Sequence, residues 1–231
     1  MSLAVYLPEN VRCSLQQSRE GNLMKKLYCV LLLALSFSFN IFSQGSKRDA
    51  LVLYHNGNYL DAIQICEQEI TDNPNRIDSY VVLCWSLVAN KQYAEAEQRA
   101  DAGLKVSPYD LRLIEIFGEA KYYLGKNLGA LEQFQKYAAT ASESGARIGA
   151  AYYYMGEIYI RQAKYQHADI SLTMAVKKEP LRDRWWARVG FAREMAGNYA
   201  ESLQAYDEAL KLNPNSYDAS RGRERVSAKL N

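Results

Sequence analysis

Small residues recur along most of the chain at a nearly constant interval. One series steps by 34 residues apart from a single step of 38, and it comprises Ala62, Ala96, Ala130, Ala168 and Ser202. A series of glycines has steps of 38 and then 34 residues, and it comprises Gly118, Gly156 and Gly190. A fixed period of this length indicates stacked structural repeats, and the shared long step indicates one four-residue insertion.

Each repeat is predicted to form two antiparallel helices. Glycine turns around Gly57, Gly125 and Gly197 separate the two helices. Residue pairs such as Asn73-Pro74 and Asn213-Pro214 end the second helix, because the residue before proline disfavours the α conformation. The small residues of the two series let the paired helices approach closely. The predicted repeats are 43–76, 77–110, 111–144, 149–182 and 183–216, followed by a charged capping helix at 217–231.

The four extra residues fall within 141–148. Four residues make about 1.1 turns of helix, so the array is expected to continue with a local change of angle. The stretch 140–145 is either a flexible joint or an ordinary loop insertion, and the sequence does not decide between them.

The repeats resemble the tetratricopeptide repeat family, whose pattern is W-x2-L-G-x2-Y, then A-x3-F, then P. The last repeat has this pattern at Trp186, Val189, Gly190, Ser202, Tyr206, Ala209 and Pro214. The resemblance implies an all-α fold, a right-handed superhelix of five hairpins with a C-terminal capping helix. Such stacks bury a continuous core that no single hairpin could bury.

The resemblance also implies that a partner binds in a concave groove lined by the first helix of each repeat. The groove positions carry aromatic and charged side chains, namely Tyr54, Trp85, Arg112, Tyr122, Tyr123, Tyr153, Glu157, Arg161, Arg184 and Phe191, with His55 and Glu194 beside them. Aromatic residues and arginine dominate binding energy at protein interfaces. The alternative is that these aromatic residues pack between neighbouring helices. Tyr122 and Tyr123 show the ambiguity, because one of them could replace the aromatic core residue that Lys121 lacks.

The N-terminal region has the pattern of a secretory signal peptide. Met24 is followed by Lys25 and Lys26, then by an apolar run over 27–42 and small or polar residues. The run of 16 residues is shorter than the roughly 20 that a membrane-spanning helix needs. We predict a signal peptide at 24–43 and a disordered upstream extension at 1–23, and hence export to the periplasm or cell envelope. An uncleaved membrane anchor and an ordinary hydrophobic helix are the alternatives.

Charge and motifs favour binding over catalysis. Residues 44–231 carry equal numbers of acidic and basic side chains, because residues 1–43 hold four of the 28 Lys and Arg and two of the 26 Asp and Glu. This balance gives no electrostatic basis for binding nucleic acid. No catalytic motif or zinc spacing is found, so no enzyme activity, metal or cofactor is expected. Cys66 and Cys84 fall at core positions, where they are buried thiols or a disulfide.

These patterns predict an exported, non-catalytic scaffold or adaptor that binds a protein or peptide in its groove. The alternatives are a small-ligand-binding or accessory subunit of an envelope transport or assembly system, and a self-assembling structural protein. The carboxylate clamp by which some family members hold chaperones is absent, because Leu51, Val82 and Ile116 replace its polar residues. A membrane contact is expected only through an uncleaved signal segment, and the oligomeric state stays open.

Overall fold

The computed structural model describes residues 49–141 and 145–231. The fold is given for Asp49–Asn231, the unit to which the described residues belong. The predicted signal peptide and upstream extension lie outside the described residues, as do residues 142–144 of the possible joint.

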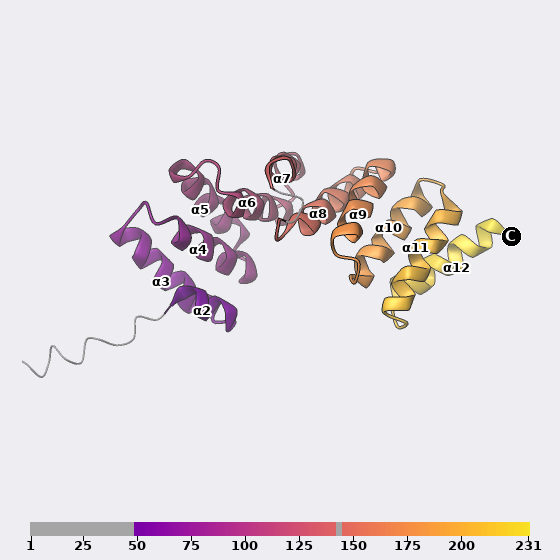
Figure 1. Ribbon diagram of the computed structural model, residues 1–231, viewed down its shortest axis with the longest axis horizontal. Coiled ribbons are helices and arrows are strands. Elements are labelled where there is room, and N and C mark those ends of the chain that lie inside the picture. The colour runs from indigo at the N-terminus through magenta and orange to yellow at the C-terminus, as the bar shows by residue number, and fades with distance from the viewer. Residues whose placement is uncertain (1–48, 142–144) are drawn as a thin grey trace, which may run out of the picture. The chain divides into compact units, whose positions relative to one another are not determined.

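The described residues form helices joined by short connections, without a strand (Figure 1). In chain order the helices are α2 (Ala50–His55), α3 (Tyr59–Asp72), α4 (Ile77–Ala89), α5 (Tyr93–Val106), α6 (Leu111–Tyr123), α7 (Asn127–Thr140), α8 (Ile148–Arg161), α9 (Tyr165–Lys178), α10 (Asp183–Met195), α11 (Tyr199–Leu212) and α12 (Tyr217–Leu230). The predicted all-α fold of five helical hairpins and a capping helix is confirmed.

Neighbouring hairpins stack mainly where the first helix of one contacts the second helix of the preceding one. We call α2, α4, α6, α8 and α10 the A helices, and α3, α5, α7, α9 and α11 the B helices. Each A helix packs on its own B helix and on the B helix of the preceding hairpin. In several places successive A helices also pack on one another, as α4 does on α2 and α6, whereas in the described part no two B helices pack closely. The A helices therefore lie on the inner side of the stack.

The turn between the A and B helices has a left-handed residue in every hairpin. These residues follow the repeat interval, and they are Gly57, Lys91, Gly125, Ala163 and Gly197. The three glycines were predicted as turn residues, and each adopts a positive φ without steric cost. Lys91 (φ 62°) and Ala163 (φ 55°) adopt the same conformation with a side chain present. The turn geometry is thus kept even where glycine is missing.

The helical glycines permit close packing, as the repeat pattern predicts. A Cβ atom on Gly156 would lie 2.5 Å from Cγ of Leu172, and one on Gly190 would lie 2.7 Å from Cδ1 of Tyr206. The same Tyr206 ring also covers Gly222 of α12, where a Cβ would clash with Cζ. Tyr206 therefore fills the space between α10 and the capping helix, and only glycine leaves room for it on both sides.

The four-residue insertion lengthens one connection and leaves the helices unchanged. Residues 141–147 join α7 to α8, whereas residues 107–110 suffice to join α5 to α6. Both α7 and α8 contain 14 residues, so the helix register resumes after the insertion. The extra residues therefore alter only the junction between the third and fourth hairpins.

The core contains both described cysteines as free thiols. Cys66 on α3 and Cys84 on α4 are fully buried and are not joined in a disulfide. Burial raises the pKa of the Cys66 thiol to about 12. This environment keeps the thiol neutral and unreactive. Within 49–141 and 145–231, no helix has both the length and the apolar character needed to cross a membrane.

Candidate partner-binding face

The sequence-predicted groove residues lie on the A helices or directly beside them. Pairs of aromatic side chains link neighbouring A helices along this side of the stack. Tyr54 of α2 lies 5.8 Å from Trp85 of α4, measured between ring centroids. Tyr153 of α8 stacks on Trp185 of α10 with centroids 5.0 Å apart and ring planes 13° apart. These four rings are partly buried, so each packs on a neighbour and still presents an edge to solvent. We call this side of the A helices the A-helix face.

A tyrosine cluster occupies the middle of the A-helix face. Tyr122 is 9% exposed and packs in the core, whereas Tyr123 is 44% exposed. Tyr123 stacks on Tyr93 of α5 with ring centroids 4.5 Å apart, and its hydroxyl lies 3.3 Å from that of Tyr154. The ambiguity in the sequence is resolved on geometry, because Tyr122 fills the core position and the side chain of Tyr123 is exposed.

Two of the charged residues predicted for the groove, Arg112 and Glu157, form ion pairs between hairpins with residues outside the predicted set. Arg112 donates to Asp78 of α4 over 2.8 Å and also to Asp110, which caps its own helix. Arg188 donates to both carboxylate oxygens of Glu157, on the preceding A helix. Glu157 and Arg112 therefore hold neighbouring hairpins together as well as lining the face.

The remaining predicted residues differ in exposure and in the contacts that their side chains already make. The guanidinium of Arg161 lies over the ring of Tyr122, 4.0 Å from the centroid, and it donates to the Tyr122 carbonyl oxygen over 3.3 Å. Phe191 is half-buried beneath Arg188, whose guanidinium lies 5.0 Å from the ring centroid. Arg184, near the start of α10, is exposed. Among the described residues, neither Arg161 nor Arg184 forms an ion pair, although Arg161 also donates to Oδ1 of Asn127 over 3.3 Å.

A buried ionic cluster lies where the third hairpin meets the fourth, and the sequence analysis did not identify it. Glu115 and Glu119 of α6 share the single guanidinium of Arg147, with distances of 2.9 Å to Glu115 and 2.6 Å to Glu119. Tyr154 of α8 donates to the other oxygen of Glu119 over 2.8 Å. The side chains of Glu115 and Glu119 are 2% and 9% exposed.

The two carboxylates of this cluster are not equally satisfied. Both oxygens of Glu119 accept hydrogen bonds, from Arg147 and Tyr154. Oε1 of Glu115 and Nε of Arg147 form an ion pair, but their geometry does not make a hydrogen bond. Burial raises the pKa of Glu115 to about 7; Arg147 lowers it in part and Glu119 raises it further. Glu115 is therefore a buried acid whose pKa lies close to neutral pH.

A pocket of about 330 Å³ opens beside this cluster. It lies between α4, α6, α7 and the α7–α8 connection, and its lining residues are Trp85, Leu111, Arg112, Glu115, Tyr137, Ala141, Gly145, Ala146 and Arg147. We call it the Glu115 pocket. Trp85 and Arg112 belong to both the pocket and the predicted groove, so the pocket adjoins the A-helix face.

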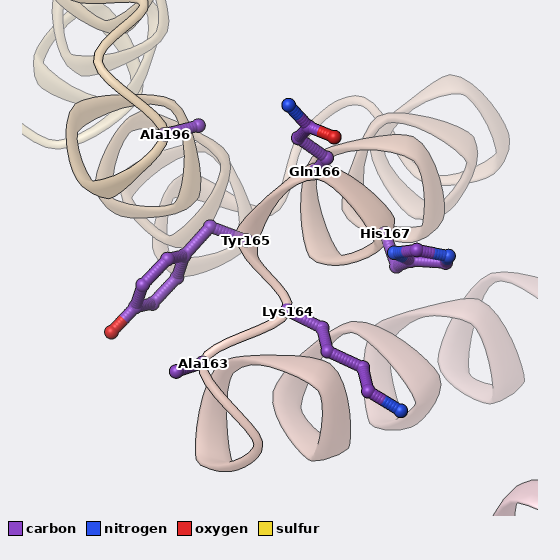
Figure 2. Close-up of a pocket in the computed structure, with 6 residues that line it drawn as sticks. All are labelled: Ala163, Lys164, Tyr165, Gln166, His167 and Ala196. Carbon is purple, nitrogen blue, oxygen red and sulfur yellow. The ribbon is translucent and has the colours of Figure 1, made fainter.

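A second cavity, of about 270 Å³, lies at the turn between α8 and α9. Figure 2 shows its lining side chains, among which Tyr165, Lys164 and His167 point away from one another. Ala196, from the turn after α10, contributes only a methyl group. A ligand site needs a few polar groups that converge on one point, and this cavity has no such arrangement.

The residues with potential for chemistry are dispersed. His55 and His167 are both exposed, and each contacts a tyrosine ring, Tyr54 and Tyr159 respectively. Among residues 49–141 and 145–231, no three His, Cys, Asp or Glu side chains are close enough together to hold a metal ion.

Comparison with known proteins agrees with this architecture. Residues 184–216, which form α10 and α11, match the family model for the tetratricopeptide repeat. The chain has the tetratricopeptide repeat fold. No curated protein matches the sequence significantly.

Solved structures of tetratricopeptide repeat proteins resemble the whole array. A structure of MamA is 17% identical with a TM-score of 0.62, and the match covers 71% of this chain and 88% of MamA. YrrB, described as a tetratricopeptide repeat protein with an unusual peptide-binding site, is 15% identical with a TM-score of 0.63 over 76% of this chain and 88% of YrrB. The C-terminal part of a tetratricopeptide repeat protein from Cytophaga hutchinsonii is 17% identical with a TM-score of 0.65 over 78% of this chain and 70% of that one. At these identities the similarity establishes the fold.

Proposed function

We propose that this protein is an exported, non-catalytic scaffold that binds a protein or peptide segment along its A-helix face. The observation that carries the proposal is the row of accessible aromatic and arginine side chains on successive A helices, above all Tyr123, Tyr153, Arg161 and Arg184. These residue types supply most of the binding energy where protein surfaces meet. The solved structure of YrrB supports the proposal, because a tetratricopeptide repeat protein of similar fold has a peptide-binding site.

The geometry favours an extended segment as the partner. Partly buried rings such as Trp85 and Tyr153 are held by stacking or tilted contacts with neighbouring rings, so they do not have to be ordered when the partner binds. Preorganised side chains reduce the entropic cost of association. A row of fixed rings on successive hairpins matches side chains spaced along a peptide.

Site-specific photo-crosslinking tests the binding face. The photoreactive residue p-benzoylphenylalanine replaces Tyr123 on the A-helix face or, as a matched control, Leu128, which is 80% exposed on α7. In the cells that make the protein, we expect Tyr123 to crosslink to a discrete protein and Leu128 not to do so. Adding Tyr153→Ala should weaken that crosslink. Equal crosslinking from both positions would contradict the proposal.

Export is tested separately, because it rests on the sequence pattern at residues 24–43. We expect the protein from the envelope fraction to begin shortly after Ser43 when its N-terminus is sequenced. A protein in the cytoplasmic fraction with an N-terminus at Met1 or Met24 would contradict export and would leave the proposed binding role intact.

A further inference from the structure

The Glu115 pocket has the dimensions of a site for one side chain. Its volume of about 330 Å³ lies at the lower end of the range of about 300–1,000 Å³ that ligand pockets occupy. Trp85, Leu111 and Tyr137 form apolar walls from three different helices. Such walls suit the aliphatic stem of a long side chain rather than a large cofactor.

The charge inside the pocket is negative. Two buried carboxylates, Glu115 and Glu119, share the one guanidinium of Arg147. The cluster therefore carries one more negative than positive charge when both acids are ionised. Glu119 is fully hydrogen-bonded, whereas Oε1 of Glu115 lacks a hydrogen-bond donor with good geometry. A buried carboxylate in this condition is stabilised by any cation that can donate to it.

Arg112, the other cation in the lining, does not offset this charge. Its guanidinium is bonded to Asp110 and to Asp78, at 2.7 Å and 2.8 Å. With these two carboxylates counted, the charged groups in and around the pocket comprise four acids and two arginines. An incoming cation would thus meet an acidic site, and an incoming carboxylate would be repelled.

We propose that the Glu115 pocket accepts one lysine or arginine side chain of a peptide bound along the A-helix face. The stem lies between Trp85, Leu111 and Tyr137, and the cationic head donates to Glu115. The inference rests on the proposed function and specifies its ligand, because a peptide crossing Trp85 and Arg112 passes the mouth of the pocket. The same site disfavours acidic peptides. It would therefore make the A-helix face selective for basic peptides as well as holding them in place.

The pocket is tested with small mimics of the side chains. The probes are n-butylammonium and n-butylguanidinium, with n-butanol and pentanoate as the neutral and anionic counterparts of similar length. Binding is followed by the NMR shifts of the Trp85 indole N–H and the Leu111 methyl groups. We expect saturable shifts with the two cations and none with the alcohol or the carboxylate. Shifts of equal size with n-butanol or pentanoate would overturn the proposal.

Two variants show whether Glu115 and the cavity are responsible. Glu115→Gln keeps the shape and removes the charge, and it should weaken binding of n-butylguanidinium by about tenfold or more. Glu132→Gln, at an exposed position on α7, is the matched control and should leave binding unchanged. Ala146→Phe fills the pocket from the exposed connection and should abolish binding with Glu115 intact. Wild-type affinity in Glu115→Gln and Ala146→Phe would overturn the proposal.

A further experiment distinguishes failure of the pocket proposal from failure of the proposed scaffold function. Peptides selected on the intact protein are made with each Lys or Arg replaced by norleucine. If peptides bind, depend on Tyr123, and lose at least about tenfold in affinity with one such replacement, both proposals stand. If they bind and depend on Tyr123 but tolerate every replacement, the pocket proposal is wrong and the scaffold function remains.

Discussion

Two junctions in the array are held by an arginine paired with carboxylates, but they differ in how well the carboxylates are hydrogen-bonded. One lies between the third and fourth hairpins, and the other lies between the fifth hairpin and α12. In each, an arginine from the following element reaches back to a carboxylate on an A helix. Arg225 of α12 donates two hydrogen bonds to Glu194, which also accepts one from Tyr206. Arg147 instead forms ion pairs with both Glu115 and Glu119, and Glu115 is left without a hydrogen bond of good geometry.

The pKa values of Glu194 and Glu115 are shifted in opposite directions because of this difference. Burial alone would raise the pKa of Glu194, but hydrogen bonds from Arg225 and Tyr206 lower it below the ordinary value. At Glu115, deeper burial outweighs the attraction of Arg147 and raises the pKa. The C-terminal junction is therefore a satisfied structural contact, whereas the central junction has two buried carboxyl groups for one guanidinium and carries an excess negative charge when both are ionised. A site that keeps such a charge at a cost in stability is a candidate for binding.

The largest difference between the junctions is expected when each arginine is removed. Arg147→Ala should lower the free energy of unfolding by about 4 kcal/mol at pH 8, because two buried carboxylates lose their only cation. Arg225→Ala should cost about 1 kcal/mol, since Glu194 is less deeply buried than Glu115 and keeps the hydrogen bond from Tyr206. Urea denaturation followed by circular dichroism measures both. Equal losses would show that burial does not distinguish the two junctions.

A difference in pH dependence should be nearly as large. The pKa of Glu115 is raised in the folded state from 4.5 to about 7, so the folded protein holds a proton that the unfolded chain releases within this range. Its contribution to stability is present below pH 4.5 and is lost as the pH rises through about 7. Relative to Glu115→Gln, the wild type should lose about 3 kcal/mol between pH 4.5 and pH 8.

Parallel urea titrations of wild type and Glu115→Gln measure this loss. Arg147 and Glu119 remain in both proteins, so the difference reports the titration of Glu115 together with its coupling to these two neighbours. Two stability curves that run parallel across the whole range would show that Glu115 titrates in the folded protein as it does in the unfolded chain.

The smallest of the three contrasts concerns the packing of the C-terminal junction. Gly222→Ala should destabilise the protein by about 2 kcal/mol, because its methyl group would overlap the Tyr206 ring that separates α10 from α12. Gly129→Ala on α7 is the matched control, since its methyl group meets only the flexible end of Lys121. Thermal unfolding of the two variants, read by calorimetry, should separate them, and a Gly222→Ala protein as stable as wild type would contradict the tight packing.

The repeat pattern predicted the fold because packing at a hairpin leaves the same small residue at the same place in each repeat. Gly156 and Gly190 illustrate this, since larger residues would collide with Leu172 and Tyr206. The turns at Lys91 and Ala163 carried no glycine signal, although the interval to Gly57 and Gly125 locates them. There the stacking of the helices determines the backbone conformation.

The candidate site was predicted only in part. The register placed Tyr123 and Tyr153 on the A helices, where the structure has them. It missed the ionic cluster because Arg147 belongs to the insertion and has no equivalent in the other repeats. Glu115 and Glu119, one turn apart in the largely apolar segment 111–120, were an available signal. Their pairing depends on the position of Arg147, which the repeat pattern does not specify.

The stacking of the A helices also bears on how the protein folds. In the described part of the chain, helices with extensive contacts are immediate neighbours in sequence or one helix removed. Each step of assembly thus closes only a short loop, and chains with such low contact order fold quickly. A folded hairpin can dock on its neighbour before the rest of the chain is ordered, so folding can proceed along the array one hairpin at a time.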